Sequence, residues 1–168
     1  DIPNTVAGAL RALLPLKPAY ITIHTSGGPA MMRAAAEAAA KGGAHRPKLL
    51  GVTVLTSLDA SDLQAIGQNY DTKQQVLRLA KLAKDNGLDG VVCSPEEVEV
   101  LRKELGPSFI LMVPGIRPSW AEAGDQKRVM TPQEAITKGA TYLVIGRPIT
   151  GAENPQDAAQ RIASELAA

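Results

Sequence analysis

Short apolar runs alternate along the chain with longer segments of helical character. Five runs rich in β-branched and aliphatic residues end in Gly, Pro or polar residues, as buried strands of about four to eight residues do. These runs cover residues 20–25, 49–56, 90–93, 109–113 and 142–145. The pattern therefore predicts five strands, each followed by a helix.

Boundary residues support the same alternation. Asp71 and Ser94 stand where a helix N-cap is expected, and Asn86 with the following glycine marks a helix end. A short helical piece is predicted to open at Asp62. The longer predicted helices cover residues 6–14, 30–41, 71–86 and 94–106, and two more begin after Thr131 and Asn154.

Continuous apolar strands joined by helices need cover on both faces, which predicts a parallel α/β architecture. A doubly wound sheet and a (β/α)₈ barrel both meet this requirement. Nearly every unusual residue lies just after a strand, as on the catalytic face of a barrel, and this favours the barrel. We expect residues 1–168 to form a single domain, the C-terminal portion of a TIM barrel, that supplies about the last five of its eight strand–helix units.

Composition narrows the classes of function. The 168 residues carry 18 Lys+Arg and 17 Asp+Glu, interspersed along the chain with a net charge of +1, which argues against a nucleic-acid or membrane-surface protein. No apolar run approaches the roughly 18 residues of a membrane span. The single Cys93 cannot form an internal disulfide or supply a thiolate metal cluster, and two histidines argue against a His-rich metal site. We expect a cytoplasmic protein and, because the chain begins with Asp1 rather than Met, residues upstream.

Two Gly-Arg turns are the main candidates for chemistry. Residues 114–117 read Pro-Gly-Ile-Arg after one predicted strand, and residues 146–149 read Gly-Arg-Pro-Ile after the next. In barrels, the loops after the seventh and eighth strands hold phosphate, because Gly lets backbone N–H groups approach and Arg offers a bidentate fork. The turns predict a phosphate site, and the alternative is two solvated loop arginines.

A long polar stretch, residues 118–128, lies between these turns. Long loops in compact domains are often lids or binding loops, so we expect it to close over the ligand. The alternative is a surface loop with Trp120 as a packing anchor. His24, at the end of a predicted strand, is interpreted as a hydrogen-bonded core histidine in preference to a residue of the barrel mouth.

Several sequence blocks follow one another in a familiar order. They are residues 1–5 (Asp-Ile-Pro-Asn-Thr), 23–28 (Ile-His-Thr-Ser-Gly-Gly), 51–57 (Gly-Val-Thr-Val-Leu-Thr-Ser), 114–117, 123–126 (Ala-Gly-Asp-Gln) and 146–149. Together they resemble the blocks of the bacterial orotidine 5′-phosphate decarboxylase family, whose signature Asp-x-Lys-x-x-Asp-Ile-Pro-Asn-Thr ends in the same five residues. The resemblance covers essentially the whole chain and implies a TIM barrel that converts orotidine 5′-phosphate to UMP and CO₂.

The resemblance also implies substrate-binding roles. Arg117, Gln126 and Arg147, with the backbone of Gly146, match the positions that grip the phosphate. Ser57 matches the serine that reads the amide edge of the pyrimidine. A nucleotide is therefore the expected ligand.

Two further residues match positions that act across a subunit boundary. Asp1, the catalytic candidate, and Thr5 match residues that reach the ribose and the reaction centre of the neighbouring subunit. The resemblance thus implies a homodimer with shared active sites.

The family uses no metal or organic cofactor. Its Lys-Asp-Lys-Asp array places an Asp against the substrate carboxylate and a Lys where it protonates the carbon that loses CO₂, and binding energy from the remote phosphate is used at the reacting centre. The signature's first Asp and its Lys would lie five and three residues before Asp1. We therefore expect the proton donor upstream and the isolated 168-residue chain to be inactive.

Two alternatives stay open. One is a related phosphate-binding barrel, such as a hexulose-phosphate synthase or keto-gulonate-phosphate decarboxylase, which would need Mg²⁺ on acidic strand-end residues. Ser57 and Gln126 favour a pyrimidine nucleotide over these substrates. The other alternative is a non-catalytic phosphate-binding module or barrel fragment.

Overall fold

The centre of the protein is a parallel sheet whose strands follow one another in chain order. The computed structural model describes residues 1–121 and 130–167. The sheet order is β1-β2-β3-β4-β5, with every pair parallel. The strands are β1 (Tyr20–His24), β2 (Lys48–Val52), β3 (Gly90–Val92), β4 (Ile110–Val113) and β5 (Tyr142–Leu143). A doubly wound sheet reverses its order at a switch point, whereas these strands do not, so the order is that of a barrel.

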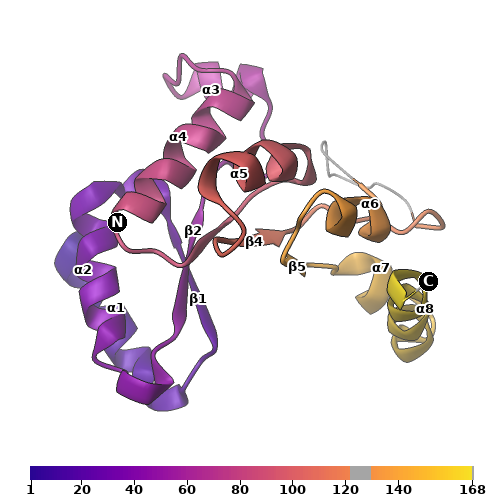
Figure 1. Cartoon of the computed structure of the whole chain (residues 1–168), viewed down its shortest axis with the longest axis horizontal. Helices are drawn as coiled ribbons and strands as arrows, with labels where there is room; N and C mark the ends of the chain where they lie inside the picture. The colour runs from indigo at the N-terminus through magenta and orange to yellow at the C-terminus, as the bar shows by residue number, and fades with distance from the viewer. Residues whose placement is uncertain (122–129, 168) are drawn as a thin grey trace.

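Helices follow the strands in chain order, from α1 and α2 at the indigo end of the colour scale to α8 in yellow (Figure 1). They are α1 (Pro3–Leu13), α2 (Gly28–Ala40), α3 (Ala60–Ala65), α4 (Thr72–Asp85), α5 (Val98–Leu105), α6 (Pro132–Thr137), α7 (Arg147–Thr150) and α8 (Pro155–Ala167). The predicted alternation is confirmed, with differences at some boundaries. The strand predicted over residues 49–56 ends at Val52, and the last strand ends at Leu143 rather than at residue 145. The helix α7 lies where a loop was predicted. In the described part of the chain, no helix is long and apolar enough to cross a membrane.

Helix starts depend on side chains that cap their first turns. Asp71 caps α4, and Ser94 forms a reciprocal capping box with the buried Glu97 ahead of α5. The start of α3 differs from the prediction. Asp59 is its N-cap, and Asp62 completes the box by accepting a hydrogen bond from the Asp59 N–H at 2.9 Å. The helix thus begins earlier than the predicted residue 62.

The two faces of the sheet differ in burial. Leu49, Val91 and Leu111 are fully buried and belong to one apolar core shared with the helices. Successive side chains of a strand point to opposite faces, so the alternate residues lie on the other face. There, Tyr142 and Val144 are 42% and 45% exposed. The apolar core shared with the helices therefore lies on one face, while Leu50 is the fully buried residue of the other face.

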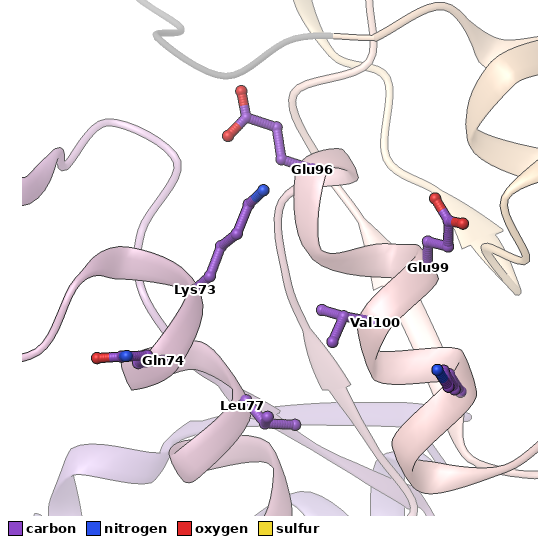
Figure 2. A pocket seen from close by; sticks show the side chains of 7 residues that line it. Lys73, Gln74, Leu77, Glu96, Glu99 and Val100 are labelled. Atoms are coloured by element: carbon purple, nitrogen blue, oxygen red, sulfur yellow. The ribbon is translucent and has the colours of Figure 1, made fainter.

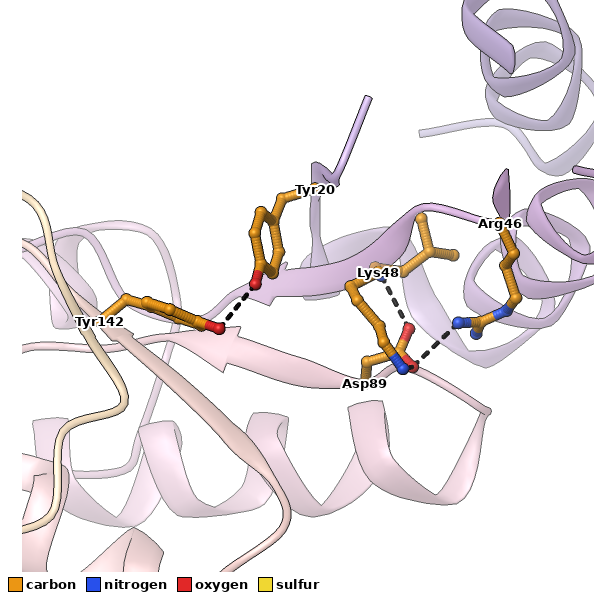
Figure 3. Close-up of polar contacts among 6 residues, drawn as sticks. Tyr20, Arg46, Lys48, Asp89 and Tyr142 are labelled. Atoms are coloured by element: carbon orange, nitrogen blue, oxygen red, sulfur yellow. Dashed lines mark hydrogen bonds and ion pairs between the residues drawn. The ribbon is translucent and has the colours of Figure 1, made fainter. Parts of the chain in front are cut away.

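A contact between the two edge strands shows that the other face is concave. Tyr20 of β1 donates a hydrogen bond to the hydroxyl of Tyr142 of β5 at 2.8 Å (Figure 3). In a flat sheet these strands would stand about 19 Å apart, because neighbouring strands are spaced about 4.8 Å. The hydroxyls can meet only if the sheet curls, as the wall of a barrel does. This hydrogen bond also raises the pKa of Tyr20 above its usual value.

Asp89 joins residues at the amino ends of β2 and β3. Its carboxylate accepts hydrogen bonds from Arg46 at 2.9 Å, from Lys48 at 3.3 Å and from the Leu49 N–H at 2.8 Å (Figure 3). Burial by itself would raise the pKa of Asp89. The hydrogen bonds outweigh burial and hold that pKa below its usual value.

Arg102 of α5 is the second polar link on this side of the sheet. Its guanidinium donates to the carbonyl of Gly139 at 2.7 and 3.1 Å, to the carbonyls of Gly106 and Phe109 at 2.8 Å each, and to the Thr141 hydroxyl at 3.0 Å. These groups belong to the segments that lead into β4 and β5. One side chain therefore holds α5 to the starts of two strands.

Candidate active site

The predicted site residues that follow strands collect at the carboxyl edge of the sheet. Ser57 follows β2, Arg117 follows β4, and Arg147 follows β5. Because the strands are parallel, these three residues lie beyond the same edge. In α/β barrels this edge is the one that carries the active site.

The turn after β4 depends on a glycine. Gly115 has φ of 76°, a conformation that disfavours residues with a Cβ. Ile116 then pairs with Met130 in a parallel bridge, and the Arg117 N–H donates to the Met130 carbonyl at 2.9 Å. Residues 116 and 130 therefore lie side by side at the sheet edge. Arg117 is half-buried next to this pair.

The turn after β5 lies beside it. Pairing of β4 and β5 extends beyond the last strand residue, because the Val144 N–H donates to the Val113 carbonyl at 2.9 Å. Gly146 then opens α7, and a Cβ built on it would meet no atom of the described residues within 4 Å. Packing among the described residues thus leaves space at Gly146, which a ligand that approaches the backbone closely could use. The expectation that the two Gly-Arg turns end neighbouring strands is confirmed, and Arg147 is exposed there.

The segment between the turns is only partly described. Gln126 lies outside the described residues, as do most of residues 118–128. Trp120 donates a hydrogen bond from Nε1 to Glu165 of α8 at 3.0 Å, and Arg161 lies over its ring at 4.7 Å. Trp120 is thus an anchor that ties the beginning of the segment to the last helix.

Asp1 borders a hollow at the end of β1. The hollow has a volume of about 490 Å³, and its polar wall is formed by Asp1, His24 and Ser26. Asp1 itself accepts a hydrogen bond from the Ile2 N–H at 2.7 Å. Thr5 is exposed on the first turns of α1.

The interpretation of His24 as a core histidine is wrong, because its side chain is exposed. His24 alternates with Ile23, which packs against the core, so His24 lies on the face away from the helices. It borders both the Asp1 hollow and a smaller cavity beneath the segment after β2. The alternation of side chains along β1 could have predicted this position. Tyr20 and His24 are four residues apart and therefore lie on the same face of the strand.

Ser57 lies in a turn. The Leu58 N–H donates to the Leu55 carbonyl at 3.0 Å, and Ser57 between them is exposed. The turn places this hydroxyl beyond the end of β2 and leaves it accessible to a ligand.

A larger hollow lies between α4 and α5 (Figure 2). It has a volume of about 530 Å³, and Lys73 reaches across it toward Glu96 above the apolar side chains of Leu77 and Val100. None of the predicted site residues that the structure describes lines it. Charges of both signs at its rim give it no preference for a phosphate.

The curled parallel sheet and its strand-end loops define an α/β-barrel protein with a candidate ligand site at the carboxyl edge. Comparison with known proteins gives the family. The model described as "Orotidine 5'-phosphate decarboxylase / HUMPS family" matches residues 1–162, and the chain belongs to this family.

Curated relatives share more than half of the sequence. A protein named orotidine 5′-phosphate decarboxylase from Rhodospirillum rubrum is 56% identical over 170 residues, which cover 99% of this chain and 69% of the relative. One of the same name from Paramagnetospirillum magneticum is 55% identical over 99% of this chain and 72% of its own length.

Solved structures agree on the fold. The crystal structure of orotidine 5′-phosphate decarboxylase from Lactobacillus acidophilus superimposes with a TM-score of 0.86 at 40% identity, over 100% of this chain and 72% of that one. The enzyme from Pyrococcus horikoshii, at 24% identity and a TM-score of 0.74, shares the fold. The five described strands with their helices are therefore part of a TIM barrel.

Proposed function

We propose that this protein is an orotidine 5′-phosphate decarboxylase, which converts orotidine 5′-phosphate to UMP and CO₂ in pyrimidine synthesis. The observation that carries the proposal is the pair of Gly-Arg turns at neighbouring strand ends, in a chain that belongs to this family. Relatives that bear this name are 55% and 56% identical over 99% of the chain, which supports the same reaction.

In this proposal, Arg117, Arg147 and Gln126 bind the 5′-phosphate together with the backbone of Gly146. Two guanidinium groups at adjacent strand ends can offset the charge of a phosphate dianion and donate to several of its oxygens. The open space at Gly146 lets a phosphate oxygen approach the main chain. Arg117 is half-buried and Arg147 exposed, so the phosphate would enter from the Arg147 side.

Ser57 binds the amide edge of the pyrimidine base in this proposal. The amide edge of the base offers one N–H donor and a neighbouring carbonyl acceptor, and a hydroxyl can both donate and accept. The exposed turn after β2 gives Ser57 access to a base whose phosphate lies beyond β4 and β5. The nucleotide would thus extend across the concave side of the sheet.

The chemistry proposed is free of cofactors. Loss of CO₂ leaves an electron pair on the ring carbon, and a positioned acid must supply a proton to it. The family's signature places that acid, a Lys, three residues before Asp1, while Asp1 faces the reaction centre of the neighbouring subunit. A polypeptide limited to residues 1–168 is accordingly expected to bind phosphate without decarboxylating the nucleotide.

The sharing of Asp1 and Thr5 between subunits makes the enzyme a homodimer in this proposal, and we assign it to the cytoplasm. Both residues are exposed at the start of the described chain, where a second subunit could reach them. Sedimentation of the full-length gene product tests the assembly. A fully active monomer at micromolar concentration would contradict shared sites.

The activity itself is tested by following the loss of orotidine 5′-phosphate absorbance with the full-length gene product. Parallel assays supply hexulose phosphate and keto-gulonate phosphate with Mg²⁺. Turnover of orotidine 5′-phosphate that persists in excess chelator supports the proposal. Turnover of a sugar phosphate alone would assign the protein to the other branch of phosphate-binding barrels.

A further inference from the structure

One row of side chains crosses the concave face of the sheet near the carboxyl ends of the strands. Strand pairing aligns His24 of β1 with Val52, Val92 and Met112 of β2, β3 and β4. Of these four side chains, only the imidazole of His24 carries an N–H that can donate a hydrogen bond. The row therefore has a single polar end, on β1.

The imidazole of His24 is available to a ligand. His24 is exposed, and its side chain forms no hydrogen bond or ion pair with another residue of the ranges 1–121 and 130–167. An exposed histidine by itself indicates no site. What sets His24 apart is its height on the barrel wall.

The contact between the edge strands gives this height. Pairing places Tyr142 in the row of His24, yet its hydroxyl meets that of Tyr20, four residues earlier on β1 (Figure 3). Four residues over the four steps from β1 to β5 make one residue per strand, the stagger of an eight-stranded barrel with a shear of eight. The same stagger, followed from His24, leads to Gly115 after β4 and to Gly146 after β5. His24 thus stands at the height of the two glycines that begin the Gly-Arg turns.

His24 also lies close to the segment that carries Ser57. It borders the same small cavity as Leu55 and Leu58, which stand on either side of the Ser57 turn. In the proposed binding mode the phosphate lies beyond β4 and β5 and the base lies near Ser57, beyond β2. The next strand is β1, on the side away from the phosphate and about 4.8 Å from β2. A base held by Ser57 is therefore within reach of a side chain at the end of β1.

We propose that His24 is a further nucleotide-binding residue, whose imidazole N–H donates a hydrogen bond to a carbonyl oxygen of the pyrimidine base. The base carries two carbonyl groups, one on each side of its N–H. Ser57 binds the N–H and one of these carbonyls, and His24 binds the other. The inference rests on the proposed function, from which it takes the positions of the phosphate and of the base.

Ligand affinity of the full-length gene product, measured by calorimetry, tests the contact. His24→Leu should weaken UMP binding about three- to tenfold, the effect of one hydrogen bond. Binding of ribose 5-phosphate, which lacks the base, should stay within about twofold of the wild-type value. His24→Gln keeps an N–H donor and should restore most of the affinity. Thr22→Val is the matched control, because Thr22 is exposed two residues earlier on the same face of β1.

Three results would overturn the contact with the base. They are equal losses for UMP and ribose 5-phosphate, equal losses in the His24→Leu and Thr22→Val variants, and a His24→Gln variant that binds UMP as weakly as His24→Leu. A crystal structure of the wild-type protein with UMP decides the point without any variant. An imidazole nitrogen within about 3.2 Å of a base oxygen supports the proposal, and an imidazole that does not touch the base overturns it.

The two proposals can fail separately. Wild-type protein that binds UMP, with no change in the His24→Leu variant, overturns the role of His24 and leaves the proposed function intact. Wild-type protein that binds no UMP overturns the proposed function and the role of His24 with it.

Discussion

Replacing Arg102 with Met should destabilise the protein more than any surface change nearby. The Met side chain keeps most of the apolar stem but removes the guanidinium that holds α5 to the starts of β4 and β5. At least the carbonyls of Gly139, Gly106 and Phe109 lose a charged donor. A hydrogen bond to a charged group contributes about 1.5 to 3 kcal/mol.

The three bonds do not add in full. They share one half-buried guanidinium, and water can replace it at the more exposed carbonyls. Counting about half of the summed value gives a loss of about 3 kcal/mol in the free energy of unfolding. At about 2 to 4 °C per kcal/mol for a domain of this size or larger, the melting temperature should fall by about 6 to 12 °C.

Urea unfolding of the full-length gene product, followed by circular dichroism, measures this loss. The midpoint should fall while the slope against urea stays constant, because the surface exposed on unfolding hardly changes. Lys103→Met is the matched control, since Lys103 is the exposed neighbour on α5. A difference below about 1 kcal/mol between the two variants would refute the reasoning that this guanidinium joins the strand starts.

Three further predictions concern the site and the acid stability. Arg147→Ala should lower kcat/KM for orotidine 5′-phosphate roughly 10- to 150-fold, the value of one charge-assisted hydrogen bond, and a loss under about threefold would remove Arg147 from the phosphate site. Ser57→Ala should weaken UMP binding, measured by calorimetry, by roughly tenfold, and unchanged affinity with unchanged turnover would make Ser57 a turn residue only. Asp89 has a folded-state pKa below its usual value, so its contribution to stability is present above the unfolded-state pKa and is lost as the pH falls through the folded-state pKa. Asp89→Asn should therefore flatten the acid end of the stability curve below about pH 4.

Neighbouring residues supply controls for these variants. Lys138→Ala removes an exposed cation that lies away from the two turns and should leave kcat/KM unchanged. Thr56→Val tests the hydroxyl next to Ser57. A loss of UMP affinity confined to Thr56→Val would assign recognition of the base to Thr56 instead of Ser57. Lys48→Met removes the longest of the contacts to Asp89 and should change the acid dependence less than Asp89→Asn does.

The sequence by itself determined the strands, most of the helices and their order, because these depend on neighbours within a few positions. Apolar runs marked every strand, and Asp71 and Ser94 marked helix starts through hydrogen bonds to their own first turns. The last strand was predicted too long because Ile145 continues its apolar pattern after pairing with β4 has ended. The Gly-Arg turns were recognisable as candidates because their residue types suit phosphate whatever the fold.

Only the tertiary structure decided which residues lie together. The curl that brings Tyr20 to Tyr142 follows from the pairing and twist of all the strands, and no local pattern encodes a contact 122 residues apart. The neighbouring positions of the two Gly-Arg turns likewise depend on β4 pairing with β5. Gln75 is a second case in which the sequence predicts the element but not the surroundings of the side chain. Its helix was predictable, but the burial of its side-chain oxygen without a hydrogen-bond partner depends on how α4 packs against the rest of the described chain.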